Sequence, residues 1–121
     1  MGTGSYSNHF IKVYNRTENA EAAWTRYRLA LSKPERDALN NDLSKYETLC
    51  SLFYSARDPE KLEQYAGMSV DELVQLAADL DAADFAKLDD DAFAEAVADL
   101  EAVDPARLAA ALASLEKMRQ P

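Results

Sequence analysis

Apolar residues recur along most of this chain at the intervals of an amphipathic helix. The first series stands at i, i+4, i+7 and i+11: Ala20, Trp24, Tyr27 and Leu31. Because these positions share one helical face, they predict a helix over about residues 17–31. Residues 9–14 (HFIKVY) have a different pattern, in which β-branched and aromatic residues favour an extended segment. A single strand forms no sheet, so this segment either packs as an arm or pairs with a copy of itself in a homodimer.

The second series predicts the longest helix, from Ser32 to about Ser55. Ser32 and Glu35 have the spacing of a capping box, and Pro34 lies in the first turn, where a missing backbone donor costs nothing. The expected apolar face of this helix is Leu39, Leu43, Tyr46, Leu49, Cys50 and Phe53.

After residue 56, signals for the start of a helix follow one another closely. Asp58 and Pro59 predict the N-cap and first residue of a short helix. That helix is expected to end at Gly67, a residue suited to the left-handed conformation. Ser69 and Glu72 form a second capping-box pair and predict another helix.

Aspartates mark three further expected helix starts. Asp81 or Ala82 begins a piece of one to two turns, with Asp81 or Asp84 as its cap. Asp90 caps the next helix, and Asp104, which precedes a proline, starts the last one. The inward positions of these last two helices are Phe93, Val97 and Leu100, and then Leu108, Leu112, Leu115 and Met118.

Part of this region repeats. Residues 79–88 (DLDAADFAKL) and 99–108 (DLEAVDPARL) are identical at six of ten positions, with an offset of 20. Both the aspartates and the leucines recur, which predicts short Asp-capped helices stacked on their neighbours. The sequence therefore predicts an all-α fold. We expect one domain over residues 1–121, a compact bundle of about six to seven helices with a short extended N-terminal arm.

Charge divides this domain into two halves. Residues 1–56 carry 6 acidic and 7 basic residues and most of the aromatic ones, whereas residues 57–121 carry 16 acidic and 6 basic residues. Between Val70 and Asp104 there are 12 carboxylates and a single cation, Lys87. An asymmetry of this kind points to a partner of opposite charge. It disfavours direct contact with nucleic acid, which is itself a polyanion.

Residues suited to catalysis or to metal binding are few. The single histidine, His9, is in the N-terminal arm, and the single cysteine, Cys50, is on an expected apolar helix face. We therefore expect neither a Ser–His–Asp nor a Cys–His catalytic arrangement. Zinc needs several Cys or His ligands, and an EF-hand loop needs a glycine, which is missing after Gly67. Glycine-rich phosphate loops are also missing. We therefore expect no enzymatic activity, no metal and no cofactor.

The charge pattern favours a protein that binds a basic protein surface and blocks it. Carboxylates on a helical surface imitate the charge of a nucleic-acid backbone and would steer the chain onto a nucleic-acid-binding groove. In size and charge, but in no sequence motif, the chain is similar to phage-encoded inhibitors of restriction or CRISPR complexes and to DNA mimics. The expected binding residues are Asp71, Glu72, Asp79, Asp81, Asp84, Asp89, Asp90, Asp91, Glu95, Asp99 and Glu101.

The alternative is a helical adaptor or assembly protein that binds through an apolar, aromatic N-terminal surface, its acidity serving solubility. Tyr6, Phe10 and Tyr14 on the arm would then be the anchors. In either case, the chain has no apolar run of membrane-spanning length and no signal-peptide pattern. We expect a cytoplasmic location, in the host cytoplasm if the protein is phage-encoded.

Overall fold

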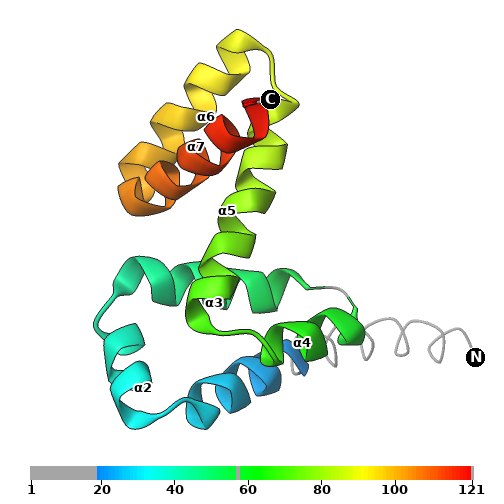
Figure 1. Ribbon diagram of the computed structural model, residues 1–121, viewed down its shortest axis with the longest axis vertical. Helices are drawn as coiled ribbons and strands as arrows, with labels where there is room; N and C mark the ends of the chain where they lie inside the picture. The colour runs from blue at the N-terminus through cyan, green and yellow to red at the C-terminus, as the bar shows by residue number, and fades with distance from the viewer. Residues whose placement is uncertain (1–18, 57, 121) are drawn as a thin grey trace, which may run out of the picture. The chain divides into compact units, whose positions relative to one another are not determined.

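The computed structural model describes residues 19–56 and 58–120, and every regular element in these ranges is a helix (Figure 1). Residues 19–30 are helical, and six further helices follow: α2 (Lys33–Asn40), α3 (Leu43–Ser55), α4 (Pro59–Ala66), α5 (Val70–Ala86), α6 (Asp90–Val103) and α7 (Pro105–Arg119). The predicted all-α fold is confirmed. The expected extended arm at residues 9–14 lies outside the described residues.

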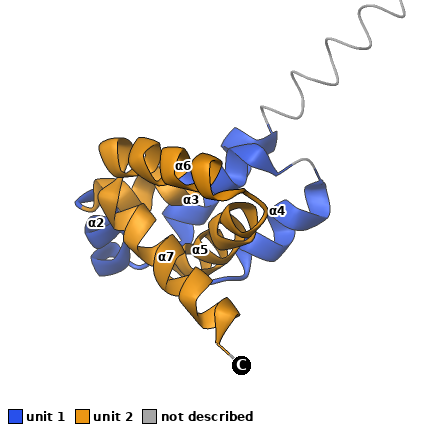
Figure 2. Cartoon of the chain, turned by 90° about the horizontal axis from the view of Figure 1, so that it is seen from above, with its two compact units in different colours: residues 1–41, 50–68 blue, residues 42–49, 69–121 orange. Residues whose placement is uncertain are grey.

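The chain divides into two compact units, which Figure 2 shows in separate colours. Of the described residues, unit 1 contains 19–41 and 50–68 without 57, and unit 2 contains 42–49 and 69–120. The boundary lies within α3, so this division does not follow the change of charge near residue 56.

Aromatic side chains make the core of unit 1. Phe53 is fully buried, and its ring centroid lies 5.4 Å from that of Trp24 and 5.3 Å from that of Tyr27. The Tyr65 ring of α4 meets Phe53 edge-on at 5.8 Å. The Tyr27 hydroxyl donates a hydrogen bond of 2.9 Å to the Met68 carbonyl, which satisfies its polar end. Such ring pairs add to the free energy gained from burying the apolar area alone.

The core of unit 2 lies between α5 and α7 and is covered by α6. One cluster of buried residues here consists of Ala82, Phe85, Leu108, Ala111 and Leu115. Phe93 of α6 packs edge-on against Phe85, with 5.7 Å between ring centroids. Figure 1 shows α6 and α7 side by side, next to the C-terminal part of α5. None of the residues of α6 is fully buried, so this helix contacts the core with one face and leaves the other in solvent.

The helix predicted from Ser32 to Ser55 is in fact two helices. Asn41 is the C-cap of α2, and the Asp42 carboxylate accepts a hydrogen bond of 3.1 Å from the backbone N–H of Lys45, in the first turn of α3. Asn and Asp compete for backbone hydrogen bonds in this way, so they favour helix ends over helix interiors. The interruption changes the helical register, and Leu43, predicted to be buried, is 70% exposed.

Four helix starts are found where the sequence predicts them, at Ser32, Asp58, Ser69 and Asp104. At Ser69 both hydrogen bonds of the capping box form. Gly67 does end α4, but its φ of −87° is right-handed, so the expected left-handed cap is wrong.

The predicted short helix from Asp81 or Ala82 to Leu88 does not exist as a separate element. Residues 70–86 form one helix, α5, and neither Asp81 nor Asp84 caps a helix start. The helix continues because Ala82 and Phe85 are buried in the core, and this packing outweighs the local preference of aspartate for a cap. The two repeat segments thus differ in structure. Residue 84 lies inside α5, whereas the matching residue of the second segment, residue 104, separates α6 from α7.

The cap of α6 is also shifted by one residue from the prediction. Asp89, not Asp90, is the N-cap, and its carboxylate accepts a hydrogen bond of 2.8 Å from the backbone N–H of Ala92. Asp90 occupies the first helical position. In the last helix, Leu108 and Leu115 are buried as expected, but Met118 is 54% exposed.

Candidate functional site

Negative charge is concentrated in unit 2. Its described residues include 15 carboxylates and five basic side chains, whereas the described residues of unit 1 include six carboxylates and five basic side chains. The candidate site is therefore sought on unit 2, where a net charge this far from zero attracts a basic surface.

The exposed face of α6 carries a row of carboxylates. Asp91, Glu95 and Asp99 follow one another at intervals of four residues, or about 6 Å of helix rise. All three are exposed, and the half-buried Phe93 and Val97 are on the opposite side of the helix, against the core. The amphipathic pattern of α6 thus fixes both where the helix packs and where its charge faces.

The structure separates the eleven predicted acidic site residues into two groups. Six are exposed, and no hydrogen bond or ion pair joins their side chains to any described residue: Asp84, Asp90, Asp91, Glu95, Asp99 and Glu101. The other five interact within the protein: Asp71, Glu72, Asp79, Asp81 and Asp89. Five of the six unpaired carboxylates are on α6, so this helix is the centre of the candidate surface.

Two of the five interacting carboxylates belong to helix caps, and the other three bind side chains. Glu72 accepts from the backbone N–H of Ser69, and Asp89 caps α6. Asp79 accepts hydrogen bonds from the Ser114 hydroxyl and the Gln75 amide. The bond from Ser114 is the main cause that lowers the pKa of Asp79, because a donated hydrogen bond favours the ionised carboxylate.

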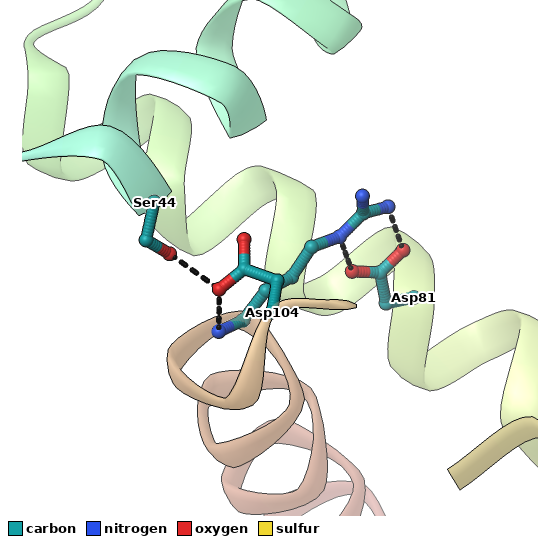
Figure 3. A network of polar contacts seen from close by, with 4 residues as sticks. Ser44, Asp81 and Asp104 are labelled. Atoms are coloured by element: carbon teal, nitrogen blue, oxygen red, sulfur yellow. Dashed lines mark hydrogen bonds and ion pairs between the residues drawn. The ribbon is translucent and has the colours of Figure 1, made fainter. Parts of the chain in front are cut away.

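Asp81 is turned inward to a single cation. Arg107 Nε donates to Asp81 Oδ2 at 2.8 Å and Nη2 donates to Oδ1 at 2.9 Å, a two-point pairing that suits the planar guanidinium (Figure 3). These hydrogen bonds raise the pKa of Arg107 above its ordinary value. Asp81 is therefore a structural residue between α5 and α7 and is unsuited to bind an external cation.

Asp104 belongs to the same network. Its Oδ1 accepts a hydrogen bond of 2.7 Å from the Ser44 hydroxyl and one of 3.1 Å from the backbone N–H of Arg107 (Figure 3). One carboxylate thus caps α7 and ties it to the first turn of α3. Arg107, whose backbone N–H binds this cap, also pairs with Asp81 of α5, so the start of α7 is held by contacts with both α3 and α5.

A small pocket lies in unit 2 where α3, α5 and α7 meet. It holds about 140 Å³, and its apolar wall consists of small residues: Val74, Ala77, Ala78, Ala106 and Ala110. Lys45 and Arg107 also line it. Sequence reasoning missed this pocket. The pattern that could have predicted it is the spacing of Ala106 and Ala110, which places two small side chains on one face of α7. They lie across the pocket from Ala77 and Ala78 of α5.

Unit 1 has a larger hollow of about 350 Å³. It is lined by two elements, helical residues 19–30 and α4: Asn19, Ala23, Arg26, Tyr27, Ala30, Pro59, Leu62, Glu63 and Ala66. The predicted anchors of the N-terminal arm, Tyr6, Phe10 and Tyr14, lie outside the described residues.

Other kinds of site receive no positive support in the described ranges. No group of three or more His, Cys, Asp or Glu side chains in residues 19–56 and 58–120 is arranged to hold a metal ion. None of the helices described is both long and apolar enough to cross a membrane.

The sequence matches no protein-family model and no curated protein, and no solved structure matches the chain.

Proposed function

We propose that the protein binds a basic protein surface through the carboxylates of α6 and blocks it. The observation that carries this proposal is a group of five exposed carboxylates on one helix that pair with no described residue: Asp90, Asp91, Glu95, Asp99 and Glu101. Because the described part of the protein leaves these charges uncompensated, a partner can neutralise them without first breaking an internal ion pair.

A surface that normally binds nucleic acid is the basic partner that fits best. The interval of about 6 Å between Asp91, Glu95 and Asp99 is close to the rise of two nucleotides in one strand of B-DNA, about 6.8 Å. A helix holds its charges at fixed positions, so lysines and arginines placed to contact phosphates can also meet these carboxylates. The long-range attraction would speed association and make it depend strongly on salt.

The test compares two variants with equal loss of charge. The α6 variant is Asp91→Asn/Glu95→Gln/Asp99→Asn, and the control variant is Glu21→Gln/Asp37→Asn/Glu47→Gln, which removes three exposed carboxylates elsewhere. Each protein is immobilised and exposed to nuclease-treated bacterial lysate, and bound proteins are eluted with a salt gradient. Captured proteins are then assayed for displacement of fluorescent duplex DNA or RNA by the soluble wild-type chain.

We expect the wild-type and control proteins to retain the same nucleic-acid-binding partner until moderate salt, and the α6 variant to lose it. Wild-type protein should displace the nucleic acid from that partner. Equal retention by the α6 variant, or elution that does not depend on salt, would contradict the proposal.

The second candidate is an adaptor that binds an apolar partner through unit 1. The hollow of about 350 Å³ favours it, because interface anchors commonly insert into such depressions. Here, binding should resist salt and should be lost in Ala30→Arg, whose side chain would enter the hollow. Ala22→Arg, on the same helix but outside that lining, is the matched control. A salt-resistant partner retained by both variants would exclude this role for the hollow.

A further inference from the structure

We infer that the pocket at the junction of α3, α5 and α7 receives an apolar side chain of the basic partner, flanked in the partner by lysine or arginine. This inference rests on the proposed function and adds a second point of contact to the acidic surface of α6. It makes the partner's recognition element a basic segment with an apolar anchor.

The size and lining of the pocket suit one aliphatic side chain. Its volume of about 140 Å³ is close to that of cavities that hold one small apolar molecule. The apolar wall comes from α5 and α7, with Ala77 and Ala78 on the first and Ala106 and Ala110 on the second. Since alanine side chains end at Cβ, the two helices leave space there that larger residues would fill.

Two strongly exposed apolar residues directly precede, in the sequence, residues at this junction. Leu43 is 70% exposed and Val103 is 79% exposed. Leu43 directly precedes Ser44, which lines the pocket, and Val103 directly precedes Asp104, whose carboxylate is 2.7 Å from the Ser44 hydroxyl. Leu43 and Val103 are thus the sequence neighbours of the two residues joined by the Ser44–Asp104 hydrogen bond. Together with the pocket, they supply apolar area for the partner next to the anchor.

Charge around the pocket favours a basic partner. Its two cations are already engaged: Lys45 lies 3.8 Å from Asp71, and Arg107 is paired with Asp81. Asp42, in the pocket lining, is a further carboxylate at this junction, as is the Asp104 cap. Counted with their ion-pair partners and the Asp104 cap, the groups at this junction are four carboxylates and two cations. Unit 2 as a whole also has an excess of carboxylates. Lysine or arginine beside the anchor would be attracted, whereas an acidic partner would be repelled.

The probe is a short fluorescein-labelled peptide with a central leucine flanked on both sides by lysines and arginines. Its counterpart has alanine at the centre. Burial of the additional leucine carbons should make the leucine peptide bind about tenfold more tightly, as measured by fluorescence anisotropy at low salt.

Two single substitutions on α7 test whether this preference comes from the pocket. Ala106→Leu fills the pocket from its rim, and Ala109→Leu adds the same side chain at an exposed position that does not line it. Ala106→Leu should abolish the preference for leucine, and Ala109→Leu should retain it. Circular dichroism checks that both variants fold, which we expect because Ala106 and Ala109 are both exposed.

The α6 variant defined above separates the two proposals. It should weaken both peptides by similar factors and leave the leucine preference intact. Equal affinities of the two peptides for the wild-type protein, with binding still weakened by salt and by the α6 variant, would overturn the pocket inference alone. An absence of salt-dependent binding to either peptide would contradict the acidic surface, and with it this inference.

Discussion

The Arg107–Asp81 pair should stabilise unit 2 measurably, although most ion pairs at protein surfaces do not. The perturbation is Arg107→Met, which keeps an unbranched side chain of similar reach and removes the guanidinium. Asp81 is only 16% exposed, so its carboxylate would lose two charged hydrogen bonds and recover little hydration.

The magnitude follows from this partial burial. A hydrogen bond to a charged group contributes about 1.5–3 kcal/mol, whereas an exposed ion pair contributes under about 1 kcal/mol. Arg107 is 34% exposed, and water would screen part of the interaction. We therefore expect Arg107→Met to lower the free energy of unfolding by about 2 kcal/mol in total, and not by the sum of two full hydrogen bonds.

A double-mutant cycle isolates the pair. The variants are Arg107→Met, Asp81→Asn and their combination, and the assay is urea denaturation followed by far-UV circular dichroism. The coupling energy should be about 1.5 kcal/mol, because the double variant leaves no buried charge unpaired. Arg119→Met is the matched control: it is exposed at the end of the same helix and should change stability by less than about 0.5 kcal/mol.

A coupling energy below about 0.5 kcal/mol would refute this reasoning. So would equal destabilisation by Arg107→Met and Arg119→Met. Either result would mean that water replaces the guanidinium at Asp81 at little cost, and that the apolar core alone holds α7 on α5.

Three further predictions concern stability. Asp89→Ala should cost about 1 kcal/mol and Asp90→Ala only a few tenths, because only the first residue caps α6, and urea denaturation of the pair checks the assignment. Phe53→Ala should cost about 3–5 kcal/mol by urea denaturation followed by tryptophan emission, and a loss below about 1 kcal/mol would contradict the aromatic core. Ser114→Ala should return the pKa of Asp79 towards 3.8 in a carboxyl NMR titration. Because folding lowers that pKa, the stability difference between wild type and this variant should be full at neutral pH and shrink below about pH 4; a difference independent of pH would contradict it.

Local sequence signals predicted the helix starts well where the signal is itself local. Ser69 with Glu72, and Asp58 or Asp104 before a proline, each start a helix in the structure. Their hydrogen bonds span only two or three residues, so no distant contact is needed to form them. For the same reason, the all-α fold and the sidedness of α6 were predictable from periodicity.

Local signals could not place a helix boundary where several residues were equally suited to be the cap. Asp89, Asp90 and Asp91 are consecutive, and the spacing to the apolar residues does not identify which one caps α6. Asp81 resembles a helix cap, yet it lies inside α5 because Ala82 is buried in the core. In these places the outcome depended on packing with another helix.

The sequence by itself determined the fold class, the placement of most helices and the concentration of negative charge in the second half of the chain. These properties depend on residues close to one another along the chain. Only the tertiary structure decided which carboxylates stay available. Asp79 and Asp81 are engaged by Ser114 and Arg107, more than twenty positions away, whereas the carboxylates of α6 meet no described partner. The alanine-lined pocket likewise exists only where three helices meet, because its volume is set by the distance between them.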